Sequence, residues 1–216
     1  MARPVKTSRT YRSPVREDQA ENTRRRIIDA AHRLFLERGY VGTTVAAVAT
    51  EAGVSPETVY VSFGGKRRLL EGVIEATILG PGAPLLTELQ GAWEEIAQLE
   101  TPRDRLRAYV EFTCGVLART SPVHAVIRAA ADAEPFAVDL RARLLEERLA
   151  RHSRWIRKDL AGALRPGLTI KLAAQRFGAL QSPELYHLVT VELGWTPVQY
   201  RQWLAALAET DLLGPP

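Results

Sequence analysis

Apolar residues in the first third of the chain recur every three or four positions, which is the spacing of amphipathic α-helices. A first helix is predicted to begin near Thr23 and to end at Gly39, with an apolar stripe of Ile27, Ile28, Ala31, Leu34 and Phe35. A shorter second helix follows the hydroxyl cap Thr44, and its inner face consists of Val45, Val48, Ala49 and Ala52. Two successive helices are therefore expected before residue 53.

The segment from Ala52 to Lys66 predicts a tight turn and a third helix. Gly53 is placed to end the second helix in the left-handed conformation that glycine adopts most readily. Ser55 then supplies an N-cap, and Pro56 takes the first position of the next helix. The inward positions around this helix are Val54, Val59 and Phe63, and the outward ones are Pro56, Glu57, Thr58, Val61 and Ser62. Two helices joined this tightly cross at a steep angle, as in a helix-turn-helix.

The rest of the chain also shows helical periodicity, and no stretch alternates with the period of two that strands require. The helices expected are 66–79, Leu85–Leu99, Arg103–Arg119, Val123–Asp132, Pro135–Leu164, 169–181 and 183–193, with a further helical stretch from Tyr200 to Leu204. Breaks are predicted at Gly80-Pro81-Gly82, at Pro122 and at Arg165-Pro166-Gly167. The expected fold class is all-α.

Charge is distributed unevenly along the 216 residues. Residues 1–75 hold 13 basic and 9 acidic side chains, whereas residues 76–216 hold 16 of each, so the whole net charge of +4 lies in the N-terminal third. Residues 1–16 contain Arg3, Lys6, Arg9, Arg12 and Arg16 and no acid. Such an arm suits a phosphate backbone or a minor groove, and it equally suits a solubilising disordered tail.

Several classes of protein are disfavoured by what the sequence lacks. Cys114 is the single cysteine, so no intramolecular disulfide is expected, and a reducing cytoplasm is the expected location. No apolar run approaches the length of a membrane span, and no secretion signal is evident. The four histidines show no metal-ligand spacing, so neither a metal nor a cofactor is expected. No phosphate-binding loop, His-Glu-x-x-His or Gly-x-Ser-x-Gly motif is present, which argues against an enzyme.

The segment from about Arg24 to Leu70 resembles the DNA-binding domain of TetR-family transcriptional regulators. The positions that match the family signature are Gly53, Val54, Ser55, Thr58, Tyr60, Phe63 and Lys66, with Val59 in place of a leucine. Ser62 departs from the signature, because the family usually has a histidine there that commonly faces the DNA backbone. A serine hydroxyl could still donate one hydrogen bond to a phosphate.

The resemblance implies a DNA-binding surface. Thr44, Tyr60 and Lys66 are expected to anchor phosphates, while Thr58 and Val61 face the major groove. Glu57 could accept a hydrogen bond from a cytosine amine. The full DNA-binding set expected is Thr44, Ser55, Pro56, Glu57, Thr58, Tyr60, Val61, Ser62 and Lys66. Arg24, Arg25 and Arg26 could meet a phosphate at the start of the first helix or form an exposed charge run.

A second stretch near the C-terminus resembles a common TetR subgroup. It runs from Gln181 to Leu188 and continues with Gly194-Trp195-Thr196-Pro197. The resemblance implies a basic flexible arm over residues 1–21, a helix-turn-helix domain over 22–68 and a helical effector-binding and dimerisation domain over 69–216. Helices 169–181 and 183–193 are candidates for the dimer interface, and the alternative contact is made by Tyr200, Trp203 and Leu207.

The function implied is that of a ligand-responsive repressor, which binds a palindromic DNA operator as a homodimer and is released by a small-molecule effector. An activator of the same fold, or an all-α protein-interaction module without an effector, remains the alternative. Effector contacts are sought among large or polar residues of the middle helices, although most of these side chains could simply be core. The candidates are Phe112, Cys114, His124, Arg128, Phe136, Trp155 and Phe177.

Overall fold

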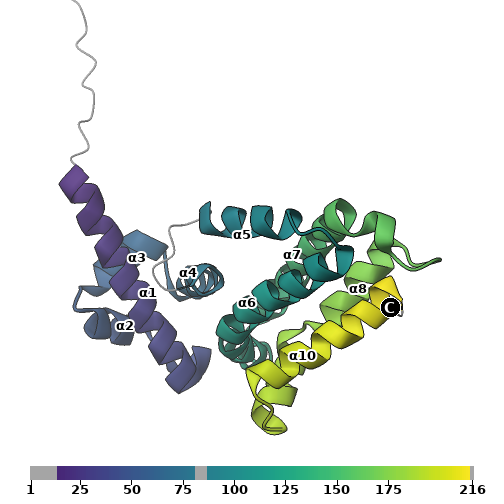
Figure 1. Ribbon diagram of the computed structural model, residues 1–216. Helices are drawn as coiled ribbons and strands as arrows, with labels where there is room; N and C mark the ends of the chain where they lie inside the picture. The colour runs from purple at the N-terminus through teal and green to yellow at the C-terminus, as the bar shows by residue number, and fades with distance from the viewer. Residues whose placement is uncertain (1–13, 81–86, 215–216) are drawn as a thin grey trace, which may run out of the picture.

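The computed structural model describes residues 14–80 and 87–214, and within them it contains ten α-helices and no strand. The helices are α1 (Pro14–Gly42), α2 (Val45–Ala52), α3 (Pro56–Phe63), α4 (Lys66–Leu79), α5 (Thr87–Ala97), α6 (Pro102–Ala130), α7 (Pro135–Asp159), α8 (Ile170–Leu180), α9 (Pro183–His187) and α10 (Pro197–Ala208). Helices α1–α4 lie at one end of the molecule, and α6–α10 form the larger bundle at the other (Figure 1). The all-α prediction is confirmed.

Helix α1 is longer than its apolar stripe indicates. It begins at Pro14, so the prediction of a start near Thr23 is wrong, and residues 14–21 of the expected arm are helical. Ser13-Pro14 repeats the hydroxyl–proline pattern of a helix start, and the acids Asp18 and Glu21 favour the positive end of a helix dipole. The predicted end is confirmed, because the backbone leaves helical geometry at Gly39 (φ 68°, ψ 176°).

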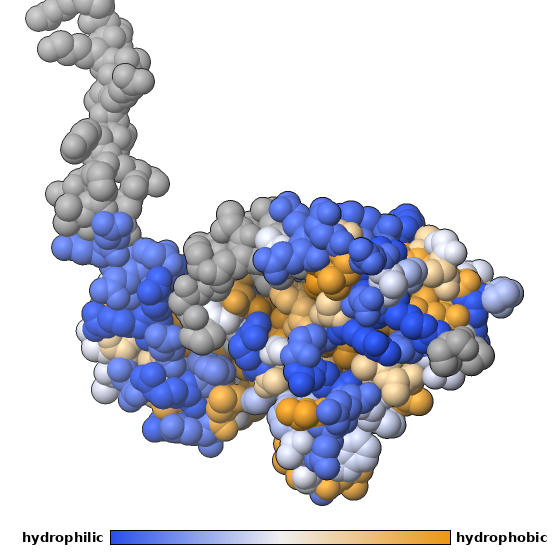
Figure 2. Space-filling model, in the orientation of Figure 1, coloured by the Kyte–Doolittle hydropathy of each residue, from blue (hydrophilic) through white to orange (hydrophobic). Residues whose placement is uncertain are grey.

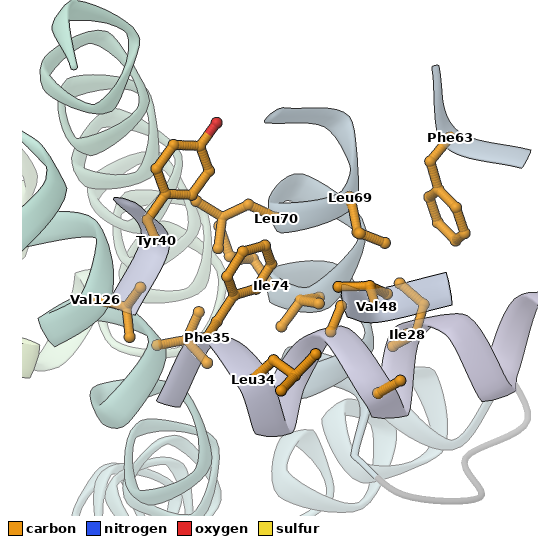
Figure 3. Close-up of a cluster of buried hydrophobic side chains, with 14 of the residues drawn as sticks. Ile28, Leu34, Phe35, Tyr40, Val48, Phe63, Leu69, Leu70, Ile74 and Val126 are labelled. Carbon is orange, nitrogen blue, oxygen red and sulfur yellow. The ribbon is translucent and has the colours of Figure 1, made fainter. Parts of the chain in front are cut away.

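The N-terminal helices share a core with the middle of the chain. Figure 3 shows Leu34 and Phe35 of α1 lying close to Leu70 and Ile74 of α4 and to Val126 of α6. All of these side chains are buried in one hydrophobic cluster, which also contains Val48, Val59 and Phe63 of the helix-turn-helix. The small N-terminal domain is therefore packed directly against α6.

Helix α6 runs unbroken through Pro122, so the prediction of two helices separated there is wrong. A proline inside a helix removes one backbone hydrogen bond and costs about 3 kcal/mol. Burial on both sides of the proline offsets that cost: Tyr109 and Val110 lie in the core of the larger domain, and Val126 and Ile127 lie in the N-terminal core. Tertiary packing decides the conformation of this segment.

The second core lies among α6, α7, α8 and α10 and is rich in aromatic side chains. Tyr109 stacks on Trp155 with ring centroids 3.7 Å apart, and Phe177 lies beside Tyr109. Tyr200 is fully buried in the same cluster. Helix α7 ends at Asp159 rather than at the predicted Leu164, and a short 3₁₀ turn, Ala161–Ala163, follows it.

The remaining elements lie close to the sequence expectations. The predicted helix 183–193 is present as α9 followed by a π turn, Leu188–Glu192, and a second π turn, Glu209–Leu213, ends the described chain after α10. Helix α5 ends at Ala97 rather than at the predicted Leu99, and its predicted start at Leu85 lies outside the described residues. None of the described helices combines the length and the apolar composition needed to cross a membrane.

Candidate nucleic-acid interface and internal cavity

Local capping defines the turn of the helix-turn-helix. The Thr44 side chain accepts a hydrogen bond from the Ala47 backbone N–H (3.1 Å) at the start of α2. Gly53 ends that helix in the left-handed region (φ 64°, ψ 42°), and Ser55 Oγ caps α3 by accepting from the Thr58 N–H (3.3 Å). Each feature was predicted from the sequence, because a cap depends on residues that lie within one turn of it.

Arginines of α1 hold the turn in place. Arg26 donates to the carbonyl oxygens of Ala52 and Gly53, the latter at 3.1 Å, and Arg24 donates to the carbonyl of Ser62 (2.9 Å). A cation at a helix C-terminus meets unpaired carbonyls and the negative end of the dipole. Two of the three arginines considered as phosphate contacts therefore bind the protein's own backbone.

Replacing Gly53 with alanine should destabilise the fold more than the same change at Gly64. Both glycines have a positive φ, so each substitution costs roughly 1–2 kcal/mol in backbone strain. A Cβ at Gly53 would also lie 2.9 Å from Arg26 Nη2, whereas a Cβ at Gly64 meets nothing within 4 Å. Displacing Arg26 from its carbonyls should add about 1 kcal/mol to the loss in the free energy of unfolding.

Urea denaturation of the two variants measures this difference. In a double-mutant cycle with Arg26→Ala, the excess cost at Gly53 should disappear, because the displaced side chain is already gone. Equal losses for Gly53→Ala and Gly64→Ala would contradict the role assigned to Arg26.

Of the predicted outward residues of α3, Pro56, Glu57 and Val61 are exposed, whereas Thr58 and Ser62 are half-buried. Val61 is 89% exposed and Tyr60 is 54% exposed, while Val59 and Phe63 are buried on the opposite side. Glu57 is fully exposed, and hydrogen bonds from its own backbone N–H and from the Ser55 hydroxyl hold the pKa of its carboxyl below the usual value. Val61, which is almost fully exposed to solvent, could contact a thymine methyl group.

Other predicted DNA-binding residues have partners within the protein. Lys66 Nζ donates to the Tyr40 carbonyl (3.0 Å) and lies 4.2 Å from the centre of the Tyr40 ring, which joins the start of α4 to the end of α1. The Thr58 hydroxyl pairs with Ser55 Oγ at 3.1 Å. Lys66 keeps two further N–H donors. Thr44 and Pro56 are exposed, and Ser62 is half-buried.

A cavity of about 150 Å³ lies within the larger domain and reaches the end of α4. Apolar and aromatic side chains line one part of it, and polar side chains line another. The lining residues are Ile78, Trp93, Phe112, Thr113, Val116, Leu117, Thr120, His124, Leu144, Glu147, Arg148, Arg151, His152, Gln181 and Pro183.

Only some of the predicted effector contacts lie at this cavity. Phe112 and His124 line it, whereas Arg128 lies outside it. Phe136 packs against Tyr40 of α1 (5.0 Å between ring centroids). The others, Cys114, Trp155 and Phe177, are buried in the second core.

Sequence reasoning missed the polar end of the cavity. Three residues of the lining each carry a buried polar atom that has no hydrogen-bond partner in the described part of the chain: Arg148 Nε, His152 Nε2 and Gln181 Nε2. Burial, reinforced by Arg151 and Arg148, lowers the pKa of His152 to about 3, and burial lowers that of His124 to about 4. Both imidazoles are neutral at pH 7, so the two arginines carry the positive charge of the lining.

The comparisons with known proteins agree with this geometry. Residues 27–73, which extend from α1 into α4, match the family model described as bacterial regulatory proteins, tetR family. This N-terminal segment therefore carries a DNA-binding domain of the TetR family type. Within its TetR-family domain, Ser62 remains the departure from the expected signature, and its carbonyl is bound by Arg24.

A curated relative of this chain is the HTH-type transcriptional regulator BetI of Brucella anthropi, which is 43% identical over 88 residues. The match covers 40% of this chain and 41% of BetI, so the chain spans about two fifths of the relative's length. The relatives are named as transcriptional regulators rather than enzymes.

Solved structures share the fold over nearly the whole chain. The native structure of NalD, described as the secondary repressor of a multidrug efflux pump in Pseudomonas aeruginosa, has a TM-score of 0.67 at 19% identity. The match covers 90% of this chain and 98% of NalD. A regulator from Saccharomonospora viridis, solved in complex with choline, has a TM-score of 0.66 at 21% identity. The match covers 89% of this chain and 98% of that regulator. The similarity of fold to these structures therefore extends beyond the matched N-terminal segment.

Proposed function

We propose that this chain is a cytoplasmic transcriptional repressor that binds a palindromic operator as a homodimer and releases it when a small molecule enters the cavity. The observation that carries the proposal is the outward face of α3, where Tyr60, Val61 and Glu57 project from a capped and buried scaffold. Figure 2 shows a largely hydrophilic surface over the N-terminal helices, as a DNA-facing domain requires.

An apolar surface of the larger domain supports the homodimer. Large hydrophobic side chains are exposed on α8, on the π turn after α9, and on α10, and hydrophobic patches lie at the lower tip of Figure 2, where the chain passes from α9 to α10. The exposed residues are Leu172, Leu188, Val191, Leu193, Val198 and Leu207. Such side chains on neighbouring elements favour association. Of the alternative contact residues, Tyr200 is fully buried within the subunit and Trp203 is half-buried, which leaves Leu207 exposed and favours helices 169–181 and 183–193 as the main part of the interface.

Contacts between the cavity and α4 support the release mechanism. Arg119 of α6 donates to the carbonyls of Thr77 (3.3 Å) and Ile78 (3.1 Å) at the end of α4, and Ile78 itself lines the cavity. Arg143 of α7 pairs with Glu71 of the same helix α4 (3.3 Å). A ligand that shifts α6 or α7 would therefore move α4 and change the spacing of the two recognition helices.

Fluorescence anisotropy of the purified full chain on DNA from upstream of its own gene tests this function. We expect tight binding to one segment, competition by the same unlabelled segment, and weaker binding to scrambled DNA. A reporter driven by that promoter should become more active when the gene is deleted. Equal affinity for every sequence would contradict an operator-specific regulator, and a fall in reporter activity would favour the activator.

The basic N-terminal residues give a separate prediction. Residues 1–13 lie outside the part of the chain that the structure describes, and they contain Arg3, Lys6, Arg9 and Arg12. Deleting residues 2–12, which leaves Ser13 and α1 in place, should lower operator affinity and flatten its salt dependence by about 0.9 in log–log slope for each phosphate that the shortened protein no longer binds. Anisotropy titrations over a range of salt concentrations measure the slope. An unchanged slope would assign the arm to a solubilising tail.

A further inference from the structure

We propose that the cavity binds a small monocarboxylate with a compact apolar body, whose carboxylate lies against Arg148, Gln181 and His152 and whose body lies against Trp93 and Phe112. The effect of this ligand on DNA binding rests on the proposed function, whereas the binding of the ligand to the cavity does not.

The charge of the lining favours an anion. Arg148 and Arg151 have no carboxylate within 4.0 Å among the described residues, while Glu147 is exposed and lies 3.9 Å from Arg143 instead. Burial lowers the pKa of Arg148, which means that its charge is poorly solvated. Glu184 partly compensates the charge of Arg148 but lies 3.8 Å from Arg141 and forms no ion pair with Arg148 within 4.0 Å, so a bound carboxylate would offset the remaining cost of burying this cation.

The hydrogen-bonding groups of the lining also favour an anionic ligand, and this argument does not depend on the charge of the arginines. The Tyr109 hydroxyl lies 2.7 Å from His152 Nδ1. When Nδ1 accepts that hydrogen bond, the single proton of the neutral ring lies on Nε2. Arg148 Nε, His152 Nε2 and Gln181 Nε2 are then all donors without acceptors. An ionised carboxylate offers acceptors only, so it suits this end of the cavity better than an amine or an alcohol does.

The size and the opposite wall of the cavity define the rest of the ligand. A volume of about 150 Å³ is comparable to that of an engineered cavity that holds benzene. Trp93 and Phe112 lie with their ring centroids 5.0 Å apart and tilted by 60°, and Val116 and Leu144 add aliphatic surface. A ring or a short branched chain fits this wall, whereas two guanidinium groups disfavour a quaternary ammonium ion such as the choline bound by the regulator from Saccharomonospora viridis.

Calorimetric titration of the full chain with benzoate, phenylacetate, cyclohexanecarboxylate and isovalerate tests the proposal. Benzamide serves as the neutral match for benzoate, and choline serves as the cation. We expect at least one carboxylate to bind and to raise the melting temperature, with benzamide and choline binding at least about 10-fold more weakly. Binding of none of the four acids, or equal binding of benzamide or choline, would overturn the proposal.

Variants of the polar end locate the site. Arg148→Met and Gln181→Leu should each weaken carboxylate binding about 10-fold or more, because each removes a donor to a charged acceptor. Arg157→Met is the matched control, since Arg157 is an exposed arginine of the same helix outside the cavity lining. Circular dichroism establishes that each variant folds, and Gln181→Leu remains informative if Arg148→Met does not. Full affinity in both folded variants, or equal loss in Arg157→Met, would contradict the placement.

The DNA assay separates this inference from the proposed function. Carboxylate binding without any effect on operator affinity would support the ligand assignment and contradict the effector mechanism. If the protein binds its operator but binds none of the carboxylates, the ligand assignment is overturned and the DNA-binding function still holds.

Discussion

Replacing Val61 with glutamate is expected to weaken operator binding strongly without unfolding the protein. Val61 is 89% exposed on α3, so the substitution removes almost no packing. In the proposed complex its side chain faces the major groove, where a carboxylate would offer no methyl group to thymine and would repel the phosphates. With a cost of roughly 1–3 kcal/mol for each of two recognition helices, operator affinity should fall about 100-fold or more. Anisotropy on the operator segment measures the change.

A matched substitution controls for the added charge. Val138 is a half-exposed valine of α7 in the larger domain, and Val138→Glu makes the same chemical change away from α3. It should leave operator affinity within a few-fold of the parent, and Val61→Ala should show an intermediate loss. Normal binding by Val61→Glu, with the fold intact, would mean that α3 is not the helix that reads the DNA.

Replacing Val191 with aspartate is expected to separate the dimer. Val191 is 65% exposed on the π turn after α9, within the proposed interface. A two-fold axis places the same substitution on both subunits, so two charges would be buried without counter-ions at one interface. The dissociation constant of the dimer should rise about 100-fold or more. Operator affinity should fall with it, because a single recognition helix discriminates poorly among DNA sequences. Light scattering coupled to size-exclusion chromatography gives the mass.

The control for this variant is Leu145→Asp. Leu145 is a half-exposed leucine of α7, outside the elements assigned to the interface. Its replacement should leave the mass and the operator affinity of the dimer unchanged. A Val191→Asp protein that remains dimeric would place the interface elsewhere, whereas dissociation by Leu145→Asp would place it on α7.

The helix-turn-helix could be read from the sequence because its determinants are local. Thr44, Gly53 and Ser55 each act on backbone groups within one helical turn, so their order along the chain already specifies where α2 ends and α3 begins. The buried positions Val48, Val59 and Phe63 also follow from helical periodicity alone.

Contacts between distant residues explain what the sequence left undetermined. Arg26 binds carbonyls that lie 26 and 27 positions away, and Lys66 binds one that lies 26 positions away. The local pattern gives such side chains no partner within the protein, so the sequence predicts a phosphate contact for Lys66 and leaves Arg26 open between a phosphate contact and an exposed charge run. Pro122 is similar, because only the packing of both halves of α6 offsets the missing hydrogen bond.

By itself, the sequence determined the all-helical class, the helix-turn-helix and the outward residues of α3, because hydrophobic periodicity and capping act over a few residues. The tertiary structure alone decided which polar side chains share the internal cavity. Arg148 and His152 lie on α7, while Gln181 follows α8, and no spacing in the chain links them. They meet because α7 and α8 pack together, closely enough that a Cβ at Gly178 would lie 2.6 Å from Leu149.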